Sequence, residues 1–324
     1  MAKQSTSEQI KRQLQVAKKI AIIGHQNPDG DALGALLAFY EILKFWQKKS
    51  IMFCTTPASQ TFEFLNNFNQ LIYDPTIFFQ QKFDTIVVLD SGSLSYAGID
   101  QILASLSYTP TIINIDHHQS NDLYGEINFI NTEASSTCEI VFELARQWQV
   151  PINKDMATAL LNGIVTDTSG LTNPATTDRS LLIAGLLMRY GANFKKISAY
   201  NVRTKEPKML KIWGLAMQRI VYDPDLHSIT TYLTQKDFAD LQVDENNLEG
   251  LSNFLSGLKD INFTLLLIEK ENGLIRGSFR TIHDHIDVGS LAASLGGGGH
   301  QKASGFVIKG KLAYNNGEIM VIQN

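Results

Sequence analysis

Three side chains that can bind a metal ion stand together at Asp116, His117 and His118. They directly follow the apolar run 111–115, which predicts a buried strand. Ligands of open α/β sheets bind beyond the carboxyl ends of parallel strands, so polar groups at this point are well placed for chemistry. By itself the tripeptide is weak evidence, because one histidine can pack against the core while the other faces solvent.

Acidic or histidine side chains follow apolar segments at three further places. One is a loop with Pro28 and Gly30 between a predicted strand and a predicted helix, and the others are the ends of the apolar segments 86–89 and 163–166. Each such residue alone could be a helix cap or a turn former. Four elements that all end this way are better explained by one shared site. Besides the tripeptide, its candidate residues are His25, Asp29, Asp31, Asp90 and Asp167.

The elements that must carry these residues alternate between strand and helix. Buried strands are predicted at 20–23, 51–54, 85–89 and 111–115. Helices are predicted at 32–46, near 59–66, from a capping pattern at Ser136 and Glu139 to 148, at 155–164 and at 178–190. This rhythm predicts an α/β fold with a mainly parallel sheet, in which the strand ends share one edge.

The last third of the chain is typical of a second, smaller α/β domain. Its strands are predicted at 228–233, 263–269 and 274–279, and its helices near 248–258 and 287–294. We therefore predict a first domain over residues 1–192, a partly helical linker over 193–224 and a second domain over 225–324. The 324 residues are enough to bury a core in each domain.

Composition argues against several classes of protein. A formal net charge of −4 predicts no broad basic face, which disfavours non-specific binding of long nucleic acid. The longest apolar run, 181–188, is too short to cross a bilayer, so no membrane partner is expected. Ser5 and Glu8 indicate the start of an amphipathic helix in place of a signal sequence. Since Cys54 and Cys138 show no disulfide or zinc spacing, we expect a cytoplasmic protein.

The donor types of the shared site favour a transition metal. Mixed imidazole and carboxylate donors suit manganese, iron, cobalt or zinc, and we expect Mn²⁺, with Co²⁺ or Mg²⁺ as substitutes. The donors are too many for one catalytic ion, but they suit two ions that share a carboxylate. Two ions about 3.5–4 Å apart can clamp the oxygens of a phosphoryl displacement and lower the pKa of a bridging water to about 7. The predicted reaction is hydrolysis of a phosphoester.

Four motifs, taken in order, make the chain resemble the DHH-family phosphoesterases, and its second half resembles the DHHA1 domain. The motifs are HQNPDGDALG at 25–34, VLD at 88–90, DHH at 116–118 and GIVTDT at 163–168. The resemblance covers nearly the whole chain. It implies a DHH catalytic domain joined to a DHHA1 substrate domain, with the active-site cleft between the two.

The resemblance also implies a role for each residue of the shared site. Asp90 would bridge the two ions, and His118 would face the substrate phosphate. Asp116 is interpreted as the group that orients His117, because metal-bound imidazoles usually donate their other N–H to an acceptor. Catalytic roles would thus fall to Asp90, His118 and Asp116. The first ion would be held by His25, Asp29 and Asp90, and the second by Asp31, Asp90, His117 and Asp167.

A glycine run near the carboxyl terminus resembles the substrate site of DHHA1. The motif GGGGHQKASG at 296–305 follows Arg280 at the family's spacing. Glycines let backbone N–H groups approach an anion closely. We expect Gly297, Gly298 and Gly299 to form a nest for phosphate, with Arg280 and His300 as charged donors.

A two-domain chain without sensory or membrane modules resembles the branch of the family that acts on short oligoribonucleotides (nanoRNAs) and adenosine 3′,5′-bisphosphate (pAp). We therefore predict a manganese-dependent nanoRNase and pAp phosphatase, with short RNA or nucleotides as partners and a homodimer as a further expectation. Two alternatives stay open: a phosphodiesterase for cyclic di-AMP or pApA, and a non-catalytic nucleotide-binding protein. The loop SGLTNP at 169–174 lacks the aromatic residues usual in the family, which leaves base preference open.

Overall fold

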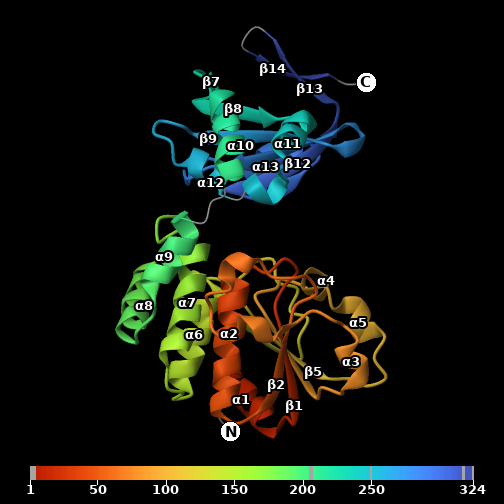
Figure 1. Cartoon of the computed structure of the whole chain (residues 1–324), viewed down its shortest axis with the longest axis vertical. Helices are drawn as coiled ribbons and strands as arrows, with labels where there is room; N and C mark the ends of the chain where they lie inside the picture. The colour runs from red at the N-terminus through yellow and green to blue at the C-terminus, as the bar shows by residue number, and fades with distance from the viewer. Residues whose placement is uncertain (1–4, 204–206, 249, 316–317, 323–324) are drawn as a thin grey trace. The chain divides into compact units, whose positions relative to one another are not determined.

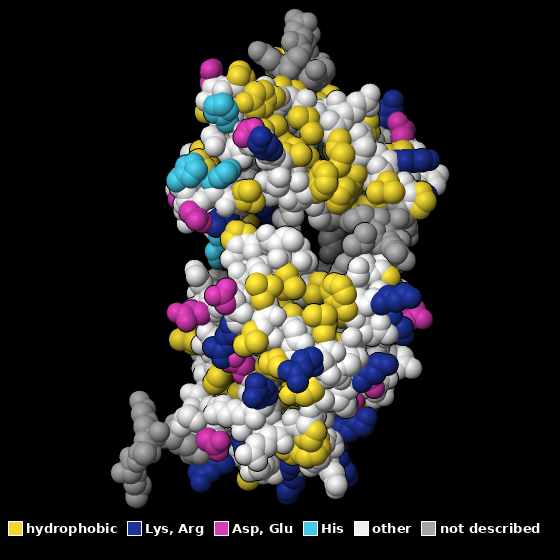
Figure 2. Space-filling view, turned by 90° about the vertical axis from the view of Figure 1, so that its left-hand side faces the viewer, with side chains coloured by type: hydrophobic (Ala, Val, Ile, Leu, Met, Phe, Trp, Pro, Cys, Tyr) yellow, Lys and Arg dark blue, Asp and Glu magenta, His cyan; other side chains and the backbone are white. Residues whose placement is uncertain are grey.

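The computed structural model describes residues 5–203, 207–248, 250–315 and 318–322 (Figure 1). The chain divides into two compact units, Met1–Thr204 and Lys205–Asn324, which we call unit 1 and unit 2. Among the described residues, no helix is long and apolar enough to cross a membrane. On the face of unit 1 that Figure 2 shows, Lys and Arg side chains lie scattered among acidic, hydrophobic and other side chains.

A parallel sheet of six strands forms the centre of unit 1, in the order β3-β2-β1-β4-β5-β6 (Figure 1). Because the paired strands are all parallel, their carboxyl ends share one edge. The predicted α/β fold with a mainly parallel sheet is confirmed. The strands are β1 (Lys19–Ile23), β2 (Lys49–Phe53), β3 (Leu71–Ile72), β4 (Thr85–Leu89), β5 (Thr111–Asp116) and β6 (Ile127–Ile130).

Helices cover both faces of this sheet and bury a separate core on each. Successive strand residues point to opposite faces, so the wholly buried β4 places Val87 in one core and Ile86 and Val88 in the other. The larger core lies under α1 (Thr6–Val16), α2 (Gly30–Phe45), α6 (Thr137–Gln147) and α7 (Lys154–Asp167), with α8 (Asp178–Arg189) and α9 (Phe194–Arg203) packed against α7. The smaller core lies under α3 (Ile77–Gln80), α4 (Leu94–Ala97) and α5 (Asp100–Ala104).

Glycines let α2 and α7 approach each other closely. A Cβ on Gly34 would lie 2.4 Å from the carbonyl oxygen of Ala159, and a Cβ on Gly30 would lie 2.4 Å from Oγ1 of Thr166. The first turn of α2 therefore lies beside the last turn of α7. This contact brings Asp31, near the start of α2, close to Asp167, the last residue of α7.

Most of the helices predicted in unit 1 are present, and one is not. The predicted starts of α1 and α6 are confirmed, since Ser5 and Ser136 accept hydrogen bonds from the backbone N–H groups of Glu8 and Glu139. The prediction of a helix over 59–66 is wrong. This segment contains only the 3₁₀ turn Gln60–Phe62. Its backbone N–H groups donate three residues back, as from Phe62 to Ser59 and from Leu65 to Phe62, and not four as in an α-helix.

Unit 2 contains a second sheet of six strands, in the order β11-β12-β10-β9-β8-β7, and is a smaller α/β domain as predicted. Apolar cores lie around Leu266 and Ile268 and around Ile275 and Phe306. The strands are β7 (Val221–Asp223), β8 (Ser228–Leu233), β9 (Phe263–Lys270), β10 (Leu274–Arg280), β11 (Gly298–His300) and β12 (Ala303–Lys309), with the separate hairpin β13 (Lys311–Asn315) and β14 (Glu318–Ile322). The helices are α10 (Pro207–Gln218), α11 (Gln235–Leu241), α12 (Leu251–Ser256) and α13 (Val288–Ser294).

The segment predicted as a linker, 193–224, contains two packed helices. Ile197 of α9 belongs to the larger core of unit 1, and Ile212 and Trp213 of α10 belong to a core of unit 2. The domain limits of 1–192 and 225–324 stay a prediction, and so does a cleft between the two domains.

Candidate metal centre

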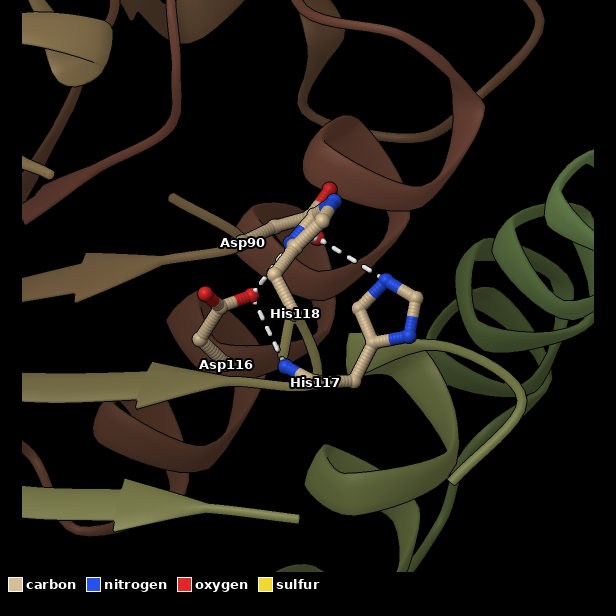
Figure 3. A group of neighbouring side chains, drawn as sticks. All are labelled: Asp90, Asp116, His117 and His118. Carbon is tan, nitrogen blue, oxygen red and sulfur yellow. Dashed lines mark hydrogen bonds and ion pairs between the residues drawn. The ribbon is translucent and has the colours of Figure 1, made fainter. Parts of the chain in front are cut away.

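Three neighbouring strands of unit 1 lead into the predicted site residues. His25 follows β1, Asp90 follows β4, and β5 ends at Asp116, with His117 and His118 next in the chain. Figure 3 shows Asp90 close to the tripeptide, beyond the strand ends. Asp90 has a left-handed φ of 59°, which is costly for a residue with a side chain. Such backbone strain is typical of functional sites.

The two carboxylate oxygens of Asp90 face two different histidines. Its Oδ2 lies 3.7 Å from Nε2 of His25, and its Oδ1 lies 3.6 Å from Nε2 of His117. Nε2 of His25 also lies 3.7 Å from Oδ1 of Asp29, and Nε2 of His117 lies 3.6 Å from Oδ2 of Asp167. Asp90 therefore stands between two groups of donors.

All six predicted metal ligands come together at this edge of the sheet. Within each of three groups, the candidate donor atoms all lie within 4.8 Å of one another. The groups share members, which makes them one continuous cluster. They are His25 with Asp29 and Asp90, then Asp31 with His117 and Asp167, and finally Asp90 with Asp116, His117 and His118.

The amino terminus of α6 fixes two of the carboxylates. The backbone N–H groups of Thr137 and Cys138 donate to the two oxygens of Asp31 over 2.6 and 2.9 Å, and the hydroxyl of Thr137 donates to Oδ1 of Asp90 over 3.0 Å. A helix amino terminus also favours negative charge. The cap of α2 is Asp29, whose Oδ1 accepts from the N–H groups of Asp31 and Ala32.

Burial leaves this cluster with unbalanced negative charge. Asp31 and Asp90 are at most 2% exposed. Burial, together with repulsion from Asp90 and Asp167, raises the pKa of Asp31 well above its usual value, and burial also raises the pKa of Asp90. Burial raises the pKa of Asp167 to about 6 although the charge of His117 acts in the opposite direction. A bound cation would relieve this repulsion, and the mix of carboxylates and imidazoles fits a divalent transition metal.

Asp116 holds the ring of His118 and accepts only the backbone N–H of His117, so the prediction that it orients the ring of His117 is wrong. Its Oδ1 accepts a hydrogen bond of 2.7 Å from Nδ1 of His118 (Figure 3). Nδ1 of His117 lies instead 3.4 Å from the carbonyl oxygen of Ala134. The hydrogen bond that His118 donates to Asp116 raises the pKa of His118 to about 9. Because β5 ends at Asp116, strand alternation does not fix the directions of His117 and His118, and this pairing could not be predicted from the sequence.

Four residues that support the centre were missed at the level of sequence. Thr137 directly follows the predicted helix cap Ser136. Backbone N–H groups at a helix amino terminus commonly bind an anion, so the position of Thr137 could have been recognised from the sequence. Asn121 donates to Oδ2 of Asp116 over 2.7 Å, and the ring of Tyr96 stacks on His25 with centroids 5.0 Å apart. Asn173, in the loop without aromatic residues, donates to the carbonyl oxygen of Asp167 over 2.9 Å.

The predicted substrate residues of unit 2 lie along a groove of about 630 Å³. Arg280 and Gly297 to Gly299 line it, but His300 does not belong to its lining. His300 is exposed, and it lies on the same sheet face as Arg280, because both pair with Ala303 of β12. The groove is lined by Arg276, Gly277, Ser278, Arg280, Gly296 to Gly299, and Ala303 to Val307.

The glycine run is partly a strand, which differs from the nest predicted for it. Gly298 and Gly299 belong to β11 and pair with Gly305 and Ser304 of β12. Ladder pairing uses part of the backbone hydrogen-bonding capacity of the run. A Cβ on Gly297 would lie 2.1 Å from the carbonyl oxygen of Gly305, so this glycine allows the close approach of β12.

Comparison with known proteins assigns a family to each unit. The model of the DHH family, N-terminal domain, matches residues 19–164, and the model of the DHHA1 domain matches residues 229–318. The first match includes His25 to His118 and ends shortly before Asp167.

Relatives cover nearly the whole chain. It is 26% identical over 291 residues to the bifunctional oligoribonuclease and PAP phosphatase NrnA of Thermus thermophilus, which covers 90% of this chain and 84% of that protein. An exopolyphosphatase-related protein from Bacteroides fragilis matches with a TM-score of 0.86 and 26% identity over 94% of this chain and 92% of that one. RecJ from Thermus thermophilus, solved in complex with Mn²⁺, shares the fold with a TM-score of 0.51 and 13% identity over 94% of this chain and 51% of that one. With both family models matched in order, unit 1 carries a DHH family N-terminal domain and unit 2 carries a DHHA1 domain.

Proposed function

We propose that this protein is a phosphoester hydrolase that cleaves short oligoribonucleotides and pAp with the help of two divalent metal ions. The observation that carries the proposal is the position of Asp90, whose two oxygens face separate groups of donors. A carboxylate shared in this way suits two metal ions close together. We expect Mn²⁺ because of the mixed donors, and RecJ, which shares the fold, was solved with this ion.

The proposed assignment of ligands to the two ions is the same as the one expected from the family resemblance. His25, Asp29 and Asp90 would hold one ion, and Asp31, Asp90, His117 and Asp167 would hold the other. When bound, such ions supply positive charge to phosphate oxygens and lower the pKa of a water molecule to about 7. The protein's own part is to keep the donors in position, which Thr137 does for both Asp31 and Asp90.

His118 is proposed to contact the substrate phosphate. Its side chain is 40% exposed, whereas that of Asp90 beside it is 3% exposed. Because Asp116 holds Nδ1, the ring is fixed in orientation and Nε2 is left for a ligand. Asp116 thus acts as a positioning residue, and His118 is the donor that a phosphate oxygen would meet.

The choice of substrates follows from the relatives and from the groove in unit 2. NrnA of Thermus thermophilus is named as an oligoribonuclease and PAP phosphatase, and the match extends along both units. The arginines and glycines of the groove suit a phosphorylated ligand. A cytoplasmic location and a homodimer remain predictions.

The first experiment tests the metal centre. We expect the purified protein to release mononucleotides from short RNA, and phosphate from pAp, with Mn²⁺ but not with EDTA. Asp90→Ala should abolish both reactions while the circular dichroism spectrum is kept, whereas Asp240→Asn, an exposed acid on unit 2, should behave as wild type. Equal activity in EDTA, or an active Asp90→Ala variant, would refute the two-metal assignment.

A second experiment tests the substrate class. We expect kcat/KM to be higher for short RNA and pAp than for pApA or cyclic di-AMP. Preference for the cyclic dinucleotide would make the protein a cyclic di-AMP phosphodiesterase. Nucleotide binding without hydrolysis of any of these compounds would make it a non-catalytic binding protein.

A further inference from the structure

Two arginines share one face of β10 in unit 2. Along Leu274–Arg280, the side chains of Arg276, Ser278 and Arg280 alternate with the buried Ile275, Gly277 and Phe279. Arg276 and Arg280 are four residues apart on the strand, which separates their Cα atoms by about 13 Å. Both line the groove, but only Arg280 belongs to the sequence motif.

The surface between the two arginines has almost no side chains. Ser278 pairs with Gly305 of β12, and Gly305 pairs with Gly298 of β11. Residues directly opposite each other in antiparallel strands share a face, so a serine and two glycines form the middle of the groove floor. A Cβ on Gly298 would meet nothing within 4 Å. The floor is therefore open to a ligand that extends along the strand.

The groove carries positive charge and no carboxylate. Its lining contains Arg276 and Arg280 but no Asp or Glu among the described residues. Burial lowers the pKa of Arg280, and repulsion from Arg276 lowers it further. An anion beside each of the two guanidinium groups would offset that repulsion.

Arg276 also has unused hydrogen-bonding capacity. Its Nη1 lies 3.1 Å from Oε2 of Glu245, outside the groove lining. Its Nε is buried and has no hydrogen-bond partner among the described residues, which costs stability. The side chain as a whole is 43% exposed, so the outer part of the guanidinium group is what a ligand would meet. Arg280 is held elsewhere, by a hydrogen bond of 2.9 Å from Nη1 to the carbonyl oxygen of Phe279. The two groups therefore present separate positions for anions.

We propose that Arg276 forms a second phosphate-binding position, which only an oligonucleotide long enough to reach it from Arg280 can occupy. The inference rests on the proposed function and adds a rule of substrate length to it. Phosphates of a stacked strand follow one another about every 3.4 Å along the axis, so 13 Å spans roughly four steps, and fewer in an extended strand. A mononucleotide or pAp at Arg280 does not extend that far.

Binding without metal separates this inference from the proposed function. In EDTA, we expect Arg276→Gln to weaken binding of a fluorescent RNA hexanucleotide about tenfold, which corresponds to the loss of one charged hydrogen bond. Binding of a dinucleotide should weaken by less than about twofold. For the hexanucleotide, the slope of log K against log salt should become shallower by about 0.7, the value for one phosphate contact on a single strand.

Three further variants complete the experiment. Arg276→Lys should restore the salt slope, because it keeps the charge. Glu245→Gln should strengthen hexanucleotide binding by releasing Arg276 from its ion pair. Lys236→Gln, which removes an exposed cation on α11, should leave both affinities unchanged. Thermal unfolding of each variant checks that the fold is kept.

The outcomes distinguish the two proposals. If Arg276→Gln lowers both affinities by the same factor, or changes neither affinity nor the salt slope, the second position does not exist. If wild type shows the length-dependent binding but releases no mononucleotide with Mn²⁺, the hydrolase function is wrong and Arg276 keeps its role as a binding residue.

Discussion

The candidate metal centre of unit 1 and the groove of unit 2 are built in opposite ways. At the centre, Asp31, Asp90 and Asp116 are buried, and hydrogen bonds hold each of them, the first two from the distant Thr137. In the groove, the glycines of β11 are exposed and the floor is open. Gathering like charges in a small volume requires dense packing, because each carboxylate must be fixed against the repulsion of the others. Binding a long anion requires accessible backbone and a few cations.

Among the substitutions that test this contrast, those of Thr137 are expected to have the largest effect. Thr137→Val removes the hydroxyl that donates to Asp90, and we expect affinity for Mn²⁺ to fall roughly 10- to 100-fold, as with other groups that support metal ligands. Thr137→Ser keeps the donor and should restore the affinity. The measurement is isothermal titration of the metal-free protein with Mn²⁺. Equal affinity in the valine and serine variants would mean that the hydroxyl does not position Asp90.

A pair of glycine substitutions tests the difference in packing directly. A Cβ on Gly163 would lie 2.2 Å from Sγ of Cys138 and 2.7 Å from Oδ1 of Asp31, whereas one on Gly298 meets nothing within 4 Å. We expect Gly163→Ala to lower the free energy of unfolding of unit 1 by about 1–3 kcal/mol. Gly298→Ala should change that of unit 2 by less than about 0.5 kcal/mol. Urea denaturation measures both, and equal losses at the two sites would contradict the contrast.

The smallest effect is a dependence of stability on pH in the absence of metal. The pKa of Asp167 is raised from 3.8 to about 6, so the folded protein holds this proton more tightly than the unfolded chain. The stabilisation is complete below pH 3.8 and is lost as the pH rises through about 6. In EDTA, the free energy of unfolding should therefore fall over this range, and less steeply in Asp167→Asn. With Mn²⁺ the fall should disappear. A rise over the same range in EDTA would contradict the raised pKa.

Residues at strand ends were the part of the site that could be predicted best. His25, Asp90 and His117 follow three parallel strands, and such strands have a common edge wherever they lie in the sheet. The partner of Asp116 was predicted wrongly because His117 and His118 lie beyond the last residue of β5, where strand alternation no longer fixes the direction of a side chain. The helix predicted at 59–66 is absent because apolar spacing does not distinguish an α-helix from the 3₁₀ turns that this segment forms.

The role proposed for Arg276, by contrast, could not be predicted from the sequence. Nothing in its sequence neighbourhood distinguishes it from a solvated arginine on a strand. Its relation to Arg280 depends on the pairing of β10 with β12. The open floor of the groove depends on the pairing of β11 with β12 at the edge of the sheet. These pairings join residues far apart in the chain, and periodicity carries no information about them.

The amino-acid sequence by itself determined the alternation of strands and helices, the two domains and the identity of the six expected metal ligands, because these depend on local patterns and on motifs with fixed spacing. Only the tertiary structure decided how the ligands are held and what surrounds them. Thr137 reaches Asp90 across 47 residues and Asp31 across 106, through the close packing of α2, α6 and α7. Such contacts depend on how helices pack against one another, and that packing is a property of the whole fold.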